Sequence, residues 1–167
     1  MAAIPTGQVQ LDPTALRHAF GSFPTGVTVV TTLDADGRPR GMTANSFTSV
    51  SLNPALLLVC IGHRAASFPA FAECRSFAVN VLREDQQEVS ARFASKSALK
   101  FADVSTVVRQ TGCPVLTDCL TWFDCTLHQR VDAGDHTVLF GRVEQFDTSR
   151  AAPLGFSRGR YVKVRPR

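Results

Sequence analysis

Small and hydroxylated side chains occupy both faces of one segment, residues 40–54, whose composition suits contact with a flat polar ligand. On one face lie Thr43, Asn45, Ser49 and Ser51, and on the other Ala44, Ser46 and Thr48. Small side chains let a planar ring approach the backbone. Amide and hydroxyl groups can match the polar edge of such a ring, where each unmatched group costs about 1–3 kcal/mol. A polar strand at the edge of a sheet would show the same weak alternation, so composition alone leaves both interpretations open.

The hydrophobic pattern around this segment predicts strands joined mostly by hairpins. Alternation of period two and β-branched residues are typical of strands, and Asp34 to Gly37 forms a turn signal. The apolar run of residues 56–61 predicts a strand buried on both faces, with Cys60 as a small buried residue. The expected strands are residues 26–33, 40–50, 56–61, 76–82, 122–131, 137–146 and 161–164.

Helices are expected only as insertions between these strands. Asp12 and Pro13 predict a helix start with a run to about residue 21, Ser67 marks a second start, and residues 85–96 predict an amphipathic surface helix. Residues 97–121 look irregular. We therefore predict a mainly β fold with helical insertions, an antiparallel barrel of six or seven strands, because closure protects strand edges. Residues 1–11 are expected to form an N-terminal arm, and residues 12–167 one domain.

Composition narrows the classes of function. The 167 residues are 44% hydrophobic and 19% charged, as in a folded globule. The net charge of +4 comes from singly scattered basic residues, which suits small anionic molecules better than nucleic acid. Five cysteines without C-x-x-C spacing favour neither a metal site nor a disulfide framework, and reduced thiols indicate a cytoplasmic protein. No signal peptide and no apolar run long enough to span a membrane is recognised.

Several segments together resemble the flavin reductase-like family, and they follow the family's order over about residues 15–162. They are Phe23-Pro24-Thr25-Gly26-Val27, Gly41-Met42-Thr43-Ala44-Asn45-Ser46-Phe47, Ser49-Val50-Ser51-Leu52-Asn53-Pro54, Phe77-Ala78-Val79-Asn80-Val81-Leu82, Phe93-Ala94, Gly134-Asp135-His136 and Gly159-Arg160-Tyr161. The resemblance implies an FMN-binding split barrel, usually a homodimer with flavin near the subunit interface. It also implies reduction of FMN or FAD by NADH or NADPH, with the reduced flavin passing to a separate monooxygenase component.

The resemblance also implies residues for the flavin. The ring would contact Thr43, Ala44, Asn45, Ser46, Ser49, Val50 and Ser51. The phosphate would lie near Ser67, Lys96 and Lys100, with Arg64 adding charge. Ser67 is expected to cap the following helix, whose first amides could bind an anion, although a cap without any ligand would look the same.

For the reacting face, the resemblance points to His136, which follows Gly134-Asp135. A histidine could bind the nicotinamide carboxamide or help to protonate reduced flavin, because its pKa lies near neutrality; a purely structural place in the turn is the alternative. The nicotinamide would contact Pro24, Thr25, Arg158 and Tyr161. Hydride transfer between two cofactors needs no protein nucleophile, and the chain has no G-x-G-x-x-G motif for a Rossmann site.

Two other functions stay open at this point. The chain could be a flavin-binding carrier or sensor, or a reductase acting on a bound non-flavin substrate such as a metal-centred cofactor. His136 and the Pro24-Thr25-Gly26 segment favour the flavin reductase, because a binding module has less need of an open nicotinamide face. The residues do not distinguish FMN from FAD, or NADH from NADPH.

Overall fold

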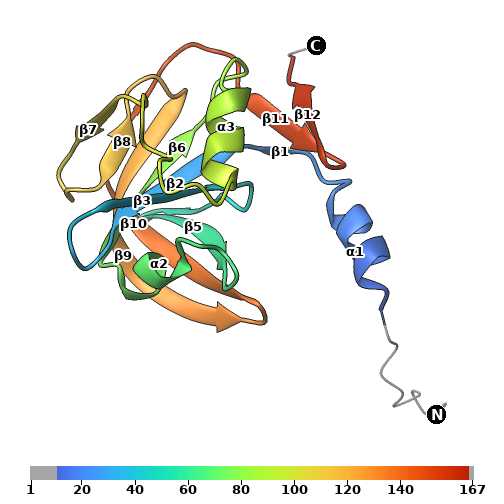
Figure 1. Cartoon of the computed structure of the whole chain (residues 1–167), viewed down its shortest axis with the longest axis horizontal. Coiled ribbons are helices and arrows are strands. Elements are labelled where there is room, and N and C mark those ends of the chain that lie inside the picture. Colours follow the sequence, from blue (N-terminus) through green and yellow to red (C-terminus); the bar gives the residue numbers. More distant parts are fainter. Residues whose placement is uncertain (1–10, 166–167) are drawn as a thin grey trace.

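The computed structural model describes residues 11–165, in which antiparallel strands dominate (Figure 1). The expected N-terminal arm therefore lies almost wholly outside the described residues. Seven strands form one sheet in the order β3-β2-β6-β9-β10-β5-β4. These strands are β2 (Thr28–Leu33), β3 (Pro39–Ala44), β4 (Thr48–Leu52), β5 (Ala55–Gly62), β6 (Ser76–Val81), β9 (Thr121–Ala133) and β10 (His136–Thr148).

The sheet curls on itself because its two edge strands are consecutive in the chain. β3 and β4 lie at opposite edges of the sheet, yet only Asn45, Ser46 and Phe47 separate them. Ser46 Oγ accepts a hydrogen bond from the Cys60 amide (2.9 Å) and donates to the Cys60 carbonyl (3.1 Å), which ties the link to β5. We call this link the seam. The expected mainly β, antiparallel barrel is confirmed as a split-barrel-like sheet of seven strands, but the expected single strand at residues 40–50 is wrong, because the chain changes edges at the seam.

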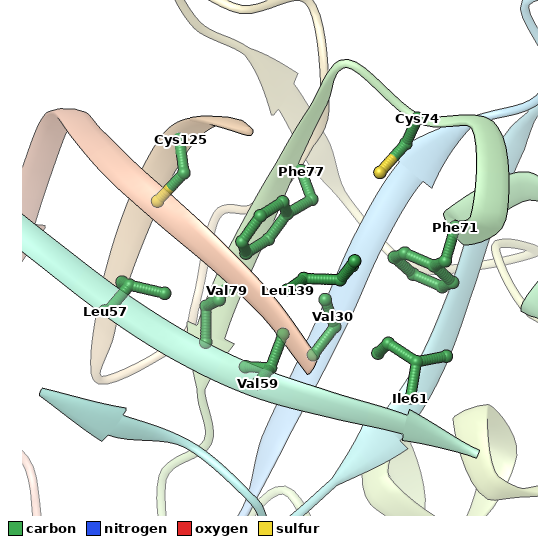
Figure 2. Packing of buried hydrophobic residues seen from close by; sticks show 10 residues of the cluster. All are labelled: Val30, Leu57, Val59, Ile61, Phe71, Cys74, Phe77, Val79, Cys125 and Leu139. Carbon is green, nitrogen blue, oxygen red and sulfur yellow. The ribbon is translucent and has the colours of Figure 1, made fainter. Parts of the chain in front are cut away.

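One apolar cluster fills the barrel interior (Figure 2). Val30 of β2, Phe77 of β6 and Leu139 of β10 are fully buried in it, and Phe71 joins them from α2 (Phe68–Glu73). A Cβ atom at Gly141 would lie 2.6 Å from Cζ of Phe77. The interior is therefore packed without spare volume, as protein cores usually are.

β5 is buried on one face only, which corrects the expectation for residues 56–61. Leu57, Val59 and Ile61 lie in the core, whereas Leu58 and Cys60 are half-buried on the outer face. The composition of an apolar strand does not show whether other residues of the same chain cover its second face. The outer face of β5 is thus apolar without being enclosed.

A buried amide joins a small hairpin to the barrel. Asn80 Nδ2 donates to the Val29 carbonyl (3.0 Å), and its Oδ1 accepts from the Leu116 amide (2.8 Å). Leu116 ends β8 (Pro114–Leu116), which pairs with β7 (Thr106–Val108). The stretch expected to be irregular therefore contains two short strands.

The remaining elements lie beside the barrel. A second sheet has the order β1-β11-β12, with β1 (Thr25–Gly26), β11 (Leu154–Ser157) and β12 (Arg160–Lys163). Beyond it stands α1 (Pro13–Phe20), clear of the barrel in Figure 1 and with no buried residue. Asp12 caps α1 as expected, since its Oδ1 accepts from the Thr14 amide (2.9 Å).

α3 (Gln87–Ala94) packs on β3 so closely that a Cβ atom at Gly41 would lie 2.8 Å from the Phe93 ring. Across residues 11–165, no helix combines the length and the apolar character that crossing a membrane requires.

Replacing Ser46 with alanine tests the seam. The Cys60 amide would lose its acceptor at a half-buried position, so the free energy of unfolding should fall by about 1–2 kcal/mol. Ser49→Ala removes an exposed hydroxyl nearby and should change it by less than about 0.5 kcal/mol. Urea unfolding followed by Trp122 fluorescence measures both; equal midpoints for the two variants would show that the seam does not depend on this hydroxyl.

Candidate functional site

Two hollows follow β3 along its side facing α3. The first, the lysine hollow, has a volume of about 160 Å³ and is lined by Arg40, Gly41, Ser67, Lys96, Ser97 and Lys100, among others. The second, the tyrosine hollow, has about 330 Å³ and is lined by Val27, Thr43, Ala44, Asn45, Ser90, Ala94, Phe156 and Tyr161. Gly41 and Thr43 are two residues apart on one strand, which places the two hollows end to end at a spacing of roughly 7 Å.

The carbonyl of Gly41 organises the lysine hollow. It accepts hydrogen bonds from Ser67 Oγ (2.9 Å) and from Lys100 Nζ (3.2 Å). Lys100 Nζ also donates to the Phe93 carbonyl (2.9 Å), and burial lowers the pKa of the Lys100 ammonium. An ammonium has three N–H donors and two are used here, so the third can serve an anion in the hollow. The sequence-based association of Lys96, Lys100 and Ser67 is thus reproduced in space.

Ser67 does not play its expected part as a helix cap. Its side chain makes no capping hydrogen bond to α2 and donates to Gly41 instead. α2 has only six residues, so its end contributes little to anion binding. Arg64 is exposed and lines neither hollow, whereas Arg40 lines the lysine hollow but is paired with Asp34 at 2.8 Å.

Ser90 of α3 fixes two walls of the tyrosine hollow. Thr43 Oγ1 donates to the Ser90 carbonyl (2.6 Å), and Tyr161 Oη donates to Ser90 Oγ (2.9 Å). Tyr161 also packs edge-on against Phe156, with ring centroids 5.7 Å apart. The walls are mostly apolar, and the amide of Asn45 lies exposed at the rim. The result is a slot that suits a flat ring with a polar edge.

Thr25 adds a polar group without a partner beside this slot. Within residues 11–165, its buried Oγ1 makes no hydrogen bond. Thr25 pairs with Phe156, a wall of the tyrosine hollow. Buried hydroxyls nearly always have partners, so this unmatched hydroxyl next to a wall of the tyrosine hollow is an exception.

The structure separates the residues expected to contact one ring. Thr43, Ala44 and Asn45 line the tyrosine hollow, whereas Ser46 is engaged at the seam. Ser49, Val50 and Ser51 lie beyond the seam on β4 and line neither hollow. The seven residues are therefore not brought together within one chain.

His136 is held firmly but stands outside both hollows. Its Nδ1 lies 2.7 Å from Asp135 Oδ1, a hydrogen bond that lowers the pKa of the Asp135 carboxyl. His136 pairs with Gly62, where a Cβ atom would lie 3.3 Å from the imidazole Nε2. Gly62 is two residues along β5 from Cys60, so the imidazole lies near the seam on the outer face of the barrel.

The structure also separates the residues that were expected to contact the nicotinamide. Tyr161 lines the tyrosine hollow, while Pro24 is exposed and does not. Arg158 lies in the turn between β11 and β12 and lines a different hollow. Sequence reasoning missed Ser90, Ala94 and Phe156; the spacing of Ser90 and Ala94, four apart on α3, is the one signal that could have found two of them.

A larger hollow of about 720 Å³ lies between the β2–β3 turn and α2 and holds none of the expected residues. Asp34, Asp36 and Glu73 line it. Against them the lining has one guanidinium, that of Arg75, so the lining is net negative and its size does not make it the site of an anionic cofactor.

A split-barrel-like sheet has two neighbouring hollows along one edge strand, one cationic and the other mostly apolar, and we call the two together the groove. They define a class of small β proteins with a candidate site for an anionic, ring-containing ligand. Within that class, the model of the flavin reductase like domain matches residues 20–165. The chain belongs to the flavin reductase-like family.

Named relatives agree with this assignment. The chain is 47% identical over 150 residues to stachydrine N-demethylase reductase subunit Stc3 of Rhizobium meliloti (strain 1021), covering 90% of this chain and 65% of the relative. It is 51% identical over 146 residues to the reductase component of flavin-dependent trigonelline monooxygenase of Acinetobacter baylyi, covering 87% and 47%. The chain thus spans about half to two thirds of the length of these relatives.

Among solved structures, the NADH:FAD oxidoreductase SgcE6 of Streptomyces globisporus, in complex with NAD and FAD fragments, matches with a TM-score of 0.86. The identity is 39%, and the match covers 93% of this chain and 94% of that one.

Proposed function

We propose that this chain is an NAD(P)H:flavin oxidoreductase that reduces FMN or FAD and supplies the reduced flavin to a separate monooxygenase component. The observation that carries the proposal is the groove along β3, because residues of this single strand line both a cationic hollow and a mostly apolar one. A flavin nucleotide has the same two parts. The names of relatives as reductase components of monooxygenases support the partner.

In this proposal the lysine hollow holds the flavin phosphate. Lys100 offers its remaining N–H and Lys96 adds a second ammonium at the rim, while the hydroxyl of Ser67 stays bonded to the Gly41 carbonyl beside them. An anion beside Lys100 also offsets the desolvation that lowers the pKa of this ammonium. Binding the phosphate and stabilising the charged lysine are therefore the same interaction.

The tyrosine hollow would hold the ring. Thr43 and Ala44 present a narrow wall, and Asn45 can both donate to and accept from the ring's polar edge. The nicotinamide would lie toward Tyr161, Thr25 and Pro24, on the side of the tyrosine hollow that the second sheet forms. When bound, the two cofactors supply the hydride donor and acceptor, and the protein contributes their proximity and orientation.

His136 would hold or move a proton at Nε2, because Asp135 occupies Nδ1 and orients the ring. This role requires the reacting end of the cofactors to reach across the seam, toward Gly62.

A homodimer belongs to the same proposal. Leu58 pairs with Phe140, and Cys60 with Val138, so four half-buried apolar residues form a patch on the outer face of β5 and β10. We call this the β5–β10 patch. Contiguous apolar patches of this kind mark protein interfaces, and His136 lies at its end, where a second copy would cover it. Residues 12–167 would act as one domain, and the five free cysteines favour a reducing cytoplasm.

Oxidation of NADH or NADPH in the presence of FMN or FAD tests the activity. We expect at least one of the four cofactor pairs to give catalytic loss of absorbance at the nicotinamide band, with turnover that depends on added flavin. No oxidation with any pair, although FMN and FAD bind, would favour a carrier or sensor and overturn the proposal.

His136→Ala should lower kcat by about 10²-fold, because positioned proton transfer contributes on that order. Flavin affinity should change by less than about twofold, since the imidazole lies outside the groove. His128→Ala, an exposed change on the same hairpin, is the matched control and should leave both quantities unchanged. Steady-state kinetics and fluorescence titration with FMN measure them; an unchanged kcat would remove His136 from the reaction.

Sedimentation velocity tests the dimer. The 18.1 kDa chain should sediment with about twice this mass, and Phe140→Asp in the β5–β10 patch should give the monomer, because it buries a charge in an apolar interface. Val108→Asp changes an exposed residue on β7 and should leave the dimer intact. A wild-type monomer, or dissociation by both variants, would contradict the assignment of this patch.

A further inference from the structure

The tip of the β9–β10 hairpin, which carries His136, has little packing to hold it. The hairpin projects past the rest of the barrel (Figure 1), and residues 131–136 are all exposed. Segments with few buried apolar contacts open easily, because only hydrogen bonds fix their position. The place of the His136 imidazole therefore depends on the polar contacts at the base of this tip.

His63, the first residue after β5, makes two of these contacts. Its amide donates to the Asp135 carbonyl (3.0 Å), and its imidazole Nε2 lies 3.0 Å from Thr137 Oγ1. Asp135 and Thr137 are the residues directly before and after His136. A single residue at the end of the neighbouring strand thus holds the chain on both sides of His136.

Thr137 extends this contact to the other strand of the hairpin. Its hydroxyl donates to Oδ1 of Asp132 (2.9 Å), its cross-strand partner on β9. A carboxylate accepts but does not donate, so the single hydroxyl proton is used here and the Thr137 oxygen must accept from His63. A neutral His63 ring must then carry its proton on Nε2. Thr137 is buried, which confines its hydroxyl to these two partners.

The His63 ring is itself anchored to a helix. It packs against Phe68, the first residue of α2, with ring centroids 4.8 Å apart. Phe68 in turn packs against the apolar cluster inside the barrel. The side chains of His63, Thr137 and Asp132 therefore connect an anchored ring to both strands of the hairpin. We call these three residues the hairpin clamp.

We propose that the hairpin clamp positions His136 for the proposed reaction, by setting the distance and angle at which the imidazole presents Nε2. This inference rests on the proposed function, in which that atom holds or moves a proton. The three clamp residues line neither hollow of the groove, and successive side chains of a strand lie on opposite faces, so the clamp acts on His136 through the backbone. Supporting residues of this kind matter because a misplacement of about 1 Å can cost about 10²-fold in rate.

Removing the Thr137 hydroxyl tests the clamp. Thr137→Val keeps the branched side chain and should lower kcat about tenfold, with KM for both cofactors within about twofold. Thr137→Ser restores the hydroxyl and should recover most of the wild-type kcat. Thr126→Val is the matched control, because Thr126 also donates to a carboxylate across β9 and β10 (Glu144, 2.6 Å), toward the other end of the hairpin. This control should leave kcat unchanged.

A double variant separates positioning from a merely structural role. Because the clamp acts through His136, Thr137→Val should cause no further loss of kcat in the His136→Ala background. His63→Phe changes an exposed position, keeps an aromatic ring on Phe68 and should lower kcat as much as Thr137→Val; it decides alone if Thr137→Val does not fold. An unchanged kcat in either folded variant, or a full further loss in the double variant, would overturn the inference.

NMR shifts of the imidazole nitrogens test the clamp without any turnover. In the wild-type chain, His63 should give the signals of the Nε2–H tautomer. Thr137→Val should shift the His136 signals, whereas Thr126→Val should not. These results would support the clamp even if no nicotinamide oxidation were seen, a result that would end the proposed function alone. An Nδ1–H tautomer at His63, or His136 signals that Thr137→Val leaves unchanged, would end the clamp and leave the proposed function standing.

Discussion

The groove depends on one constraint: β3 is an edge strand, and its outward backbone groups must find partners without another strand. The Gly41 carbonyl finds them in Ser67 and Lys100, which come from distant parts of the chain. An unsatisfied carbonyl in this position would either cost free energy or invite another chain to pair. Side-chain donors solve both problems, and they also gather a buried ammonium and a hydroxyl at one place. The cationic hollow thus follows from the way the edge is satisfied.

Hydrogen-bonded hydroxyl groups also hold the other walls of the groove. Thr43 reaches the Ser90 carbonyl of α3, and Tyr161 reaches the Ser90 hydroxyl from the second sheet. These hydrogen bonds hold β3, α3 and β12 at fixed distances, and the tyrosine hollow lies between them. Bulky apolar residues at the same positions would have closed it, because cores pack to high density. The small, hydroxylated composition of residues 40–54 is therefore a condition for a hollow as well as a set of ligand contacts.

Sequence patterns predicted those parts of the fold that form between residues close together in the chain. The β9–β10 hairpin was predictable because alternation and its turn lie side by side in the sequence. The seam was not, because β3 and β4 share one composition and differ only in their partners, β2 and β5. Ser67 is a second example: its sequence context predicts a helix cap, but its backbone is helical where a cap is extended, and its hydroxyl donates to a carbonyl 26 residues away. Lys100 and Tyr161 came only from the family resemblance, since neither carries a local signal of burial or of a shared hollow.

To reduce a flavin, a protein mainly has to hold the flavin and nicotinamide rings together and to exclude water from them. In a single chain the tyrosine hollow opens at its rim, and His136 stands on the far side of the seam, beside the half-buried β5–β10 patch. Leu58, Cys60, Val138 and Phe140 on this face are half-buried, and α1 stands clear of the barrel (Figure 1). In the proposed homodimer a second chain would cover this apolar face, because a twofold contact places the β5–β10 patch of one copy against the same patch of the other. The second copy of the proposed homodimer would thus serve the chemistry directly, by excluding water where the two rings and the imidazole would meet.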